Sequence, residues 1–151
     1  MALPAAGEDA ETPLWWETPY GRERRRTEER AMAKHFPRFH LEEAFGPTRE
    51  LSWIGRIKSS LSGKRYAVSV TYPAAFPNYA PEVTIEAHRF PDGVPHLIEG
   101  KKPCLYAPAQ GWRHGYDPGR TTAATMVFWT SLWIHAYETW RETGVWPGSG
   151  V

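Results

Sequence analysis

Three short segments with alternating apolar and polar side chains constrain the fold of this chain most. The apolar positions are Leu51, Trp53 and Ile57 in the first segment, Tyr66, Val68, Val70 and Tyr72 in the second, and Val83, Ile85 and Ala87 in the third. A period of two places these side chains on one face of each strand. Short connections then predict an antiparallel meander with one apolar face, which a helix must cover. Residues 38–44 are a weaker candidate for a further strand.

A helix is expected before the meander. Residues 19–36 are compatible with a helix that has Pro19 in its first turn and ends before Pro37. Its apolar positions are few and its charges are mainly basic, so we expect one narrow packed face and one solvated face. Docking of an acidic partner on the basic side is the alternative interpretation.

A second, longer helix is expected near the end of the sequence. Residues 122–143 contain neither Gly nor Pro, and Gly144 follows as a typical C-terminal cap. The segment is apolar on most sides, which predicts a helix that is largely buried, or partly buried and partly an interface. His135 is expected to be a core histidine with a hydrogen-bond partner.

Prolines make the connection between the second and third alternating segments stiff. Pro73, Pro77 and Pro81 each fix their own φ and push the preceding residue toward an extended conformation. We expect this crossover to give structural support rather than flexibility.

The only cysteine, Cys104, lies in residues 94–112, a sequence rich in Pro and Gly that predicts an irregular loop. His96 precedes the cysteine and Trp112 follows it. A lone thiol with a polar partner close in sequence is either a reactive nucleophile or a buried cysteine without chemistry. Lys101 and Lys102 favour the thiolate, although salt screens exposed lysines.

Length and charge limit the class of protein. The 151 residues fit one domain with its own core. The 18 basic and 17 acidic side chains give a net charge of +1, so neither nucleic acid nor a membrane is an expected partner. We expect a flexible leader over residues 1–17, a single domain over 18–147 and a tail over 148–151.

Localisation and cofactors follow from what the sequence lacks. One cysteine permits no disulfide within the domain, and the acidic first residues do not have the pattern of a signal peptide, so a cytoplasmic location is expected. The sequence contains no phosphate-loop motif and no metal-ligand spacing. We therefore expect no cofactor and no metal.

The order of helix, strand meander, Pro-rich crossover, cysteine loop and long helix indicates an α+β fold. Over roughly residues 18–143 it resembles the ubiquitin-conjugating (E2) fold. YPAAFPNYAPEVTI (residues 72–85) resembles the family's aromatic-Pro-x-x-aromatic-Pro-x-x-Pro-Pro-x-V stretch, with Ala80 at the first of the paired prolines. LSWIGRI resembles the preceding strand. Cys104 falls at the position of the catalytic cysteine, and Trp112 follows at the family's spacing.

The sequence departs from the usual E2 pattern in two ways, and both indicate a narrower group of relatives. The family's His-Pro-Asn motif is replaced by Val94-Pro95-His96, and the sequence is truncated relative to eukaryotic E2 proteins, which usually continue with two more helices. Both features resemble divergent prokaryotic E2-like proteins. The Trp-rich ending YETWRETGVWPG further resembles E2-like proteins of bacterial CBASS anti-phage operons.

The resemblance implies acyl transfer by a thiol. Cys104 would accept the C-terminal carboxyl of a ubiquitin-like protein or of a cGAS-like nucleotidyltransferase as a thioester and pass it to an amine. An E1-like activating enzyme is a further candidate partner. His96 would act as oxyanion donor or acid–base, or would only brace the loop. The alternative is an inactive E2-fold module that only binds a partner.

Four residues beyond the cysteine are candidates for lining the same cleft: Tyr106, His114, Tyr116 and Asp117. In the family, an acidic or polar residue there helps to position the incoming lysine amine. Asp117 is the candidate for that role, although a turn-forming Asp before Pro118 is the commoner explanation.

Overall fold

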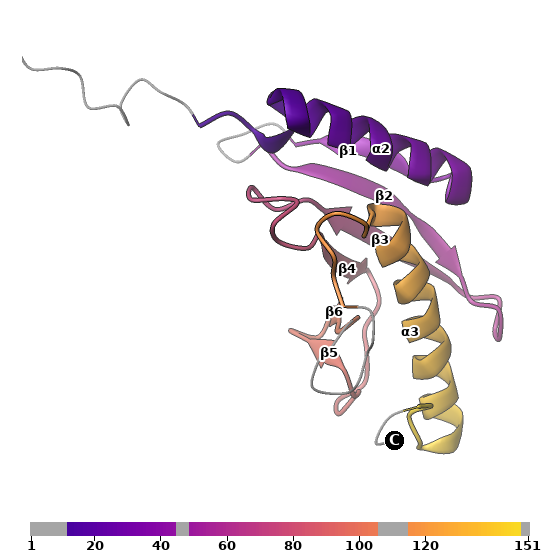
Figure 1. Ribbon diagram of the computed structural model, residues 1–151. Coiled ribbons are helices and arrows are strands. Elements are labelled where there is room, and N and C mark those ends of the chain that lie inside the picture. Colours follow the sequence, from indigo (N-terminus) through magenta and orange to yellow (C-terminus); the bar gives the residue numbers. More distant parts are fainter. Residues whose placement is uncertain (1–11, 45–48, 106–114, 149–151) are drawn as a thin grey trace, which may run out of the picture.

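The computed structural model describes residues 12–44, 49–105 and 115–148. Its elements, in chain order, are η1 (Trp15–Glu17), α2 (Pro19–His35), β1 (His40–Glu43), β2 (Leu51–Lys58), β3 (Arg65–Thr71), β4 (Glu82–Glu86), β5 (Leu97–Ile98), β6 (Lys102–Pro103) and α3 (Ala123–Thr143). Figure 1 shows a sheet with α3 lying across it and a small hairpin beside it. The predicted α+β order is confirmed.

The four longer strands form an antiparallel sheet in the order β1-β2-β3-β4. In its register Trp53 pairs with Val70, and Val70 pairs with Val83, so the apolar positions predicted from alternation lie side by side. These three residues are buried. α3 contacts β2, β3 and β4 and so provides the predicted helical cover.

The core also contains two tryptophans that precede α2. The Trp15 ring lies 5.0 Å from the Tyr72 ring and 4.7 Å from the Phe76 ring, and Trp16 is buried beside it. Gly21 makes this packing possible, because a Cβ atom there would lie 1.4 Å from the Trp15 carbonyl oxygen. Aromatic packing therefore fastens η1 to the rest of the domain.

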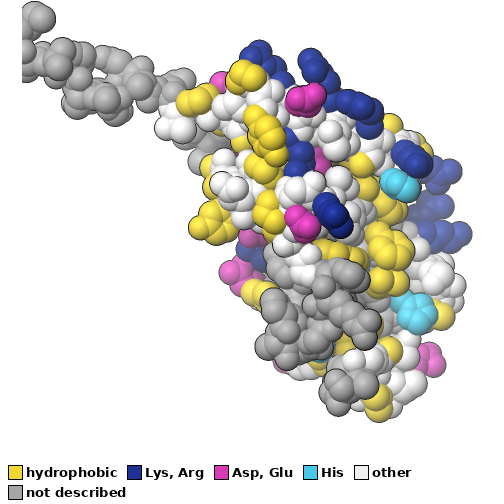
Figure 2. Space-filling view, viewed as in Figure 1, with side chains coloured by type: hydrophobic (Ala, Val, Ile, Leu, Met, Phe, Trp, Pro, Cys, Tyr) yellow, Lys and Arg dark blue, Asp and Glu magenta, His cyan; other side chains and the backbone are white. Residues whose placement is uncertain are grey.

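The basic face of α2 is solvated in part. Arg22, Arg26, Arg30 and Lys34 are exposed, and Figure 2 shows Lys and Arg side chains gathered along the edge of the molecule that α2 forms. The expectation of a solvated face is wrong for Arg24, which is buried.

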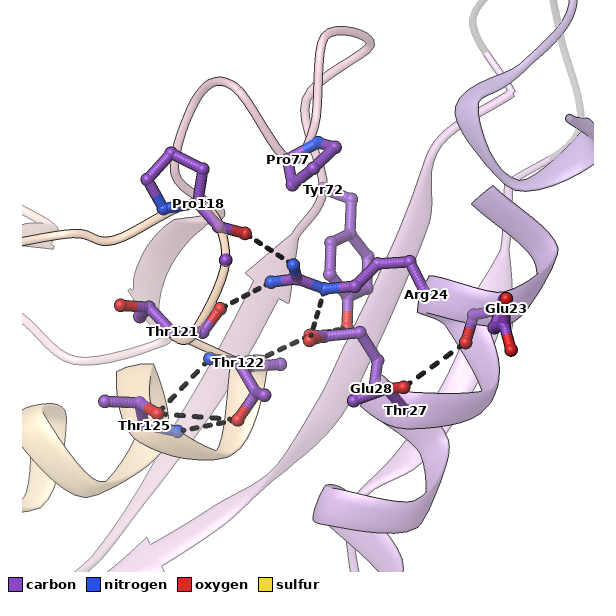
Figure 3. A network of polar contacts seen from close by, with 12 residues as sticks. Glu23, Arg24, Thr27, Glu28, Tyr72, Pro77, Pro118, Thr121, Thr122 and Thr125 are labelled. Carbon is purple, nitrogen blue, oxygen red and sulfur yellow. Dashed lines mark hydrogen bonds and ion pairs between the residues drawn. The ribbon is translucent and has the colours of Figure 1, made fainter. Parts of the chain in front are cut away.

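Glu28 is the centre of a buried polar network between α2 and the beginning of α3 (Figure 3). Its carboxylate accepts hydrogen bonds from the Ala123 N–H at 2.8 Å and the Tyr72 hydroxyl at 2.7 Å. Arg24 Nε lies 3.3 Å from the same carboxylate. Burial raises the pKa of Glu28, while these three groups oppose the rise.

Arg24 also holds the segment that leads into α3. Its guanidinium donates to the carbonyl oxygens of Pro118 and Thr121 and lies 4.9 Å above the Phe76 ring. The Arg24 guanidinium and the Glu28 carboxylate of α2 therefore hold the start of α3 in place.

Thr122 caps α3, because its hydroxyl accepts from the Thr125 N–H, and Gly144 ends the helix with φ +76°. One face of the helix is buried, but Phe128 and Leu132 are 53% and 47% exposed. The expectation that His135 belongs to the core is wrong, because its side chain is exposed on the same outer face. Among the described residues, no helix has both the length and the apolar character needed to cross a membrane.

Candidate functional site

A short antiparallel hairpin carries the cysteine. β5 pairs with β6, and Glu99 and Gly100 in the turn have φ of 54° and 70°. Glycine adopts this left-handed conformation without steric cost. The Lys101 carbonyl oxygen accepts from the Ile85 N–H at 2.8 Å, which ties the hairpin to β4. The segment expected to be irregular therefore contains a small sheet that the sequence did not reveal.

Cys104 follows the hairpin directly. Its backbone N–H donates to the His96 carbonyl oxygen at 2.8 Å, which extends the ladder and places the two residues side by side. Pro103 and Leu105 are buried, whereas Cys104 is half-buried. A cysteine with an anchored backbone that is not fully buried meets the first requirement of a nucleophilic cysteine.

α3 holds His96 from the other side. Trp133 Nε1 donates to the His96 carbonyl oxygen at 2.9 Å, so that oxygen accepts from both the cysteine and the helix. His96 has φ +55°, in the left-handed region where non-glycine residues are uncommon. Its side chain is half-buried. Hydrogen bonds from two directions therefore define its backbone position.

The two lysines before the cysteine differ in their surroundings. Lys102 Nζ lies 3.0 Å from Glu82 and 3.0 Å from Glu99, and the hydrogen bond with Glu82 is the main reason its pKa is raised. Two carboxylates therefore offset its charge. Lys101 is the exposed cation of the pair.

Tyr116 and Asp117 lie in the segment that leads into α3. The Tyr116 hydroxyl donates to the Pro77 carbonyl oxygen. Asp117 is exposed, and its carboxylate accepts from the Gly119 N–H at 2.9 Å, while its carbonyl oxygen accepts from the Thr121 N–H at 2.8 Å. These contacts are those of a turn-forming aspartate.

An open cleft of about 530 Å³ lies between this segment and α3. The described side chains that line it include Tyr116, Asp117, Arg120, Thr125 and Trp129. Three residues that the sequence assigned to the site or its support, Tyr106, Trp112 and His114, lie outside the described residues.

The prolines of the crossover lie beside the core. Pro81 is buried, and Pro73 and Pro77 are half-buried. The Pro73 carbonyl oxygen accepts from the N–H of Phe76, whose ring is buried against Trp15. The crossover also contacts the segment that leads into α3, because the Pro77 carbonyl oxygen accepts from the Tyr116 hydroxyl.

Sequence reasoning missed Trp133 and the pair formed by Arg24 and Glu28. The available signal was spacing, because Arg24, Glu28 and Met32 recur at four-residue intervals and form one stripe of α2. Within the described part of the chain, no group of three His, Cys, Asp or Glu residues can hold a metal ion.

The fold is consistent with an E2-like protein: an N-terminal helix, a four-stranded antiparallel meander, a small hairpin and a C-terminal helix. Residues 28–151 match the family described as Type II CBASS E2 protein, and the chain belongs to this family. No curated protein matches the chain. Family membership implies an E2-like role in CBASS anti-phage defence.

Proposed function

We propose that the protein is an acyl carrier and transferase with Cys104 as its nucleophile. The main support is the position of Cys104, which is half-buried and whose N–H donates to the His96 carbonyl oxygen. The chain belongs to a family of E2 proteins, which supports the same role. The acyl group is the C-terminal carboxyl of a ubiquitin-like protein or of a cGAS-like nucleotidyltransferase. An E1-like enzyme or an equivalent activating partner delivers it as a thioester or another activated carboxylate.

The proposed reaction has two steps. The Cys104 thiolate attacks the activated acyl carbon, and the bond from that carbon to its leaving group breaks. An amine nitrogen then attacks the new thioester, the carbon–sulfur bond breaks, and the thiolate is regenerated. The nitrogen loses a proton to a base, and an oxyanion forms and collapses in each step.

His96 is the proposed support for this chemistry. An imidazole N–H can donate to the oxyanion, and a neutral ring can accept the amine proton near neutral pH. The backbone hydrogen bonds to Cys104 and Trp133 favour a role for this residue close to the nucleophile. Asp117 remains a candidate for positioning the amine, although its contacts favour a structural role in the turn.

Intact-mass analysis tests the proposal. The purified chain is incubated with an activating enzyme, ATP and each candidate acyl donor. The expected product is an adduct that a thiol reductant removes, that becomes resistant to the reductant in Cys104→Ser, and that is absent in Cys104→Ala. Ser131→Ala, an exchange of similar size on α3, is the matched control. An equal adduct on Cys104→Ala overturns the assignment of the nucleophile.

A binding module without catalysis is the second candidate. The exposed apolar side chains of Phe128 and Leu132, four residues apart on α3, favour it, because large side chains of this kind are used in protein contacts. A stable complex with a CBASS component that forms equally with wild type and Cys104→Ala, without any adduct, supports the module. Loss of the complex in Leu132→Glu would place the contact on α3.

A further inference from the structure

The chain turns sharply after α3 and brings a tryptophan back toward the hairpin. Gly144 has φ +76°, and its N–H donates to the Trp140 carbonyl oxygen at 2.7 Å. The Thr143 hydroxyl donates to the Val145 carbonyl oxygen and accepts from the Val145 N–H, both at 3.1 Å. The turn is therefore well defined, and Trp146 follows it directly.

Trp146 lies half-buried between His96 and Trp133. Its ring centroid is 5.1 Å from that of His96, with the planes at 55°, and 5.5 Å from that of Trp133, with the planes at 59°. Both distances lie within the range of favourable aromatic contacts. Trp146 thus contacts the candidate histidine and the residue that holds its backbone.

The two tryptophans act on different parts of His96. Trp133 donates to the carbonyl oxygen and fixes the backbone, but this bond leaves rotation about the side-chain bonds free. Trp146 contacts the imidazole itself. An indole packed against an imidazole restricts the ring to fewer orientations.

We propose that Trp146 is a positioning residue that orients the His96 imidazole beside Cys104. This inference rests on the proposed function of Cys104 and His96. The imidazole can transfer a proton or donate a hydrogen bond only when the ring lies within hydrogen-bond distance of its partner. A ring that rotates freely spends less time in this productive orientation. The segment after α3 therefore contributes to the site although it carries no reacting group.

Transfer is measured by loading Cys104 with the acyl group and following discharge to an amine in a single turnover. We expect Trp146→Ala to slow discharge by up to about 100-fold, as geometric misplacement does, while the amount of thioester loaded changes little. Trp146→Phe, which keeps an aromatic ring, should restore most of the rate. Trp140→Ala is the control, because Trp140 is half-buried near the same end of α3 and contacts Tyr137 rather than His96.

A double-mutant cycle separates positioning from general destabilisation. If Trp146 acts through His96, Trp146→Ala has no further effect on discharge in a His96→Ala background. Additive losses, or an unchanged rate in Trp146→Ala alone, overturn the inference. Thermal unfolding of each variant shows whether the domain remains folded.

Nuclear magnetic resonance gives a readout that needs no activity. The ring protons of His96 should carry a shift from the indole ring current that disappears in Trp146→Ala and remains in Trp140→Ala. If wild type forms no thioester but shows this shift, the proposed function fails while the contact stands. If the thioester forms and neither the shift nor the rate changes, only the role of Trp146 fails.

Discussion

The backbone N–H of Cys104 donates to the carbonyl oxygen of His96 at 2.8 Å. The peptide groups of the cysteine and the histidine are therefore neighbours because the hairpin between them closes. Anything that strains the turn of that hairpin should also disturb the relation between these two residues.

Gly100 offers a direct test, since it lies in this turn with φ +70° and a Cβ atom there would contact nothing within 4 Å. Gly100→Ala should lose about 1–2 kcal/mol through backbone strain alone, because alanine adopts the left-handed conformation poorly. Gly100→Asn should lose less, because asparagine tolerates this conformation. Urea unfolding measures both, and equal stability of the two variants would contradict the strain argument.

Arg24 should be far more important for stability than its half-buried neighbour Arg25. Removing one partner of a buried ion pair costs about 3–5 kcal/mol, so Arg24→Ala should reduce the free energy of unfolding by that amount. Arg25 pairs with Glu29 at 3.0 Å near the surface, and Arg25→Ala should cost about 0–1 kcal/mol. Similar losses in the two variants would show that the network in Figure 3 contributes little.

The loss in Arg24→Ala should also depend on pH through Glu28. Burial already raises the pKa of this carboxyl above 4.5, and Arg24 lowers it, so removing Arg24 raises it further. A carboxyl with a raised pKa in the folded state stabilises the fold below its unfolded pKa, and that stability is lost as pH rises through the folded pKa. The deficit of Arg24→Ala should be larger at about pH 8 than at about pH 5.

His88 gives a prediction of the opposite sign. Burial lowers its pKa below 6.5, and the charges of Lys64 and Arg141 lower it further. The neutral ring is therefore favoured in the folded state, and its contribution to stability is lost as pH falls through the folded pKa. Lys64→Met should raise the pKa of His88 in a titration followed by nuclear magnetic resonance. Lys58→Met is the control, and an equal rise in both variants would argue against a specific contact.

Gly21 is a position where helix propensity and packing disagree. Alanine is favoured over glycine in a helix by about 1 kcal/mol. However, a Cβ atom here would meet the Trp15 carbonyl oxygen, and overpacking costs about 1–3 kcal/mol, so Gly21→Ala should lower the denaturation midpoint. Thr27→Ala, at an exposed position of the same helix, should not lower it. A gain in Gly21→Ala would mean that η1 does not pack on α2 as described.

The sheet was predictable because its strands have a regular side-chain period, and the helices because Pro19, Pro37 and Gly144 mark their ends. Val70 and Val83 alternate with polar neighbours, so the strands and their buried face follow from sequence alone. β5 and β6 have only two residues each, and left-handed backbone at Glu99 separates them, so they leave no periodic signal. An apolar helix does not show which side faces solvent, which is why the prediction for His135 failed.

The candidate site could be predicted only in part. The proximity of Cys104 and His96 followed from their closeness in sequence. The contacts of Trp133 and Trp146 with His96 were not predictable, because they join segments far apart in the chain. For Arg24, the rule that arginines are usually exposed gave the wrong answer.

The hydrogen bond from Ala123 to Glu28 joins residues that are 95 positions apart. During synthesis on a ribosome, α2 emerges long before Ala123, whose backbone N–H donates to the buried Glu28 carboxylate of α2. Until the start of α3 leaves the exit tunnel, Glu28 lacks the Ala123 N–H, and the partners already synthesised are Arg24 and Tyr72. The finished domain therefore forms only after most of the chain has been made, and this interval is when chaperones would have access to it.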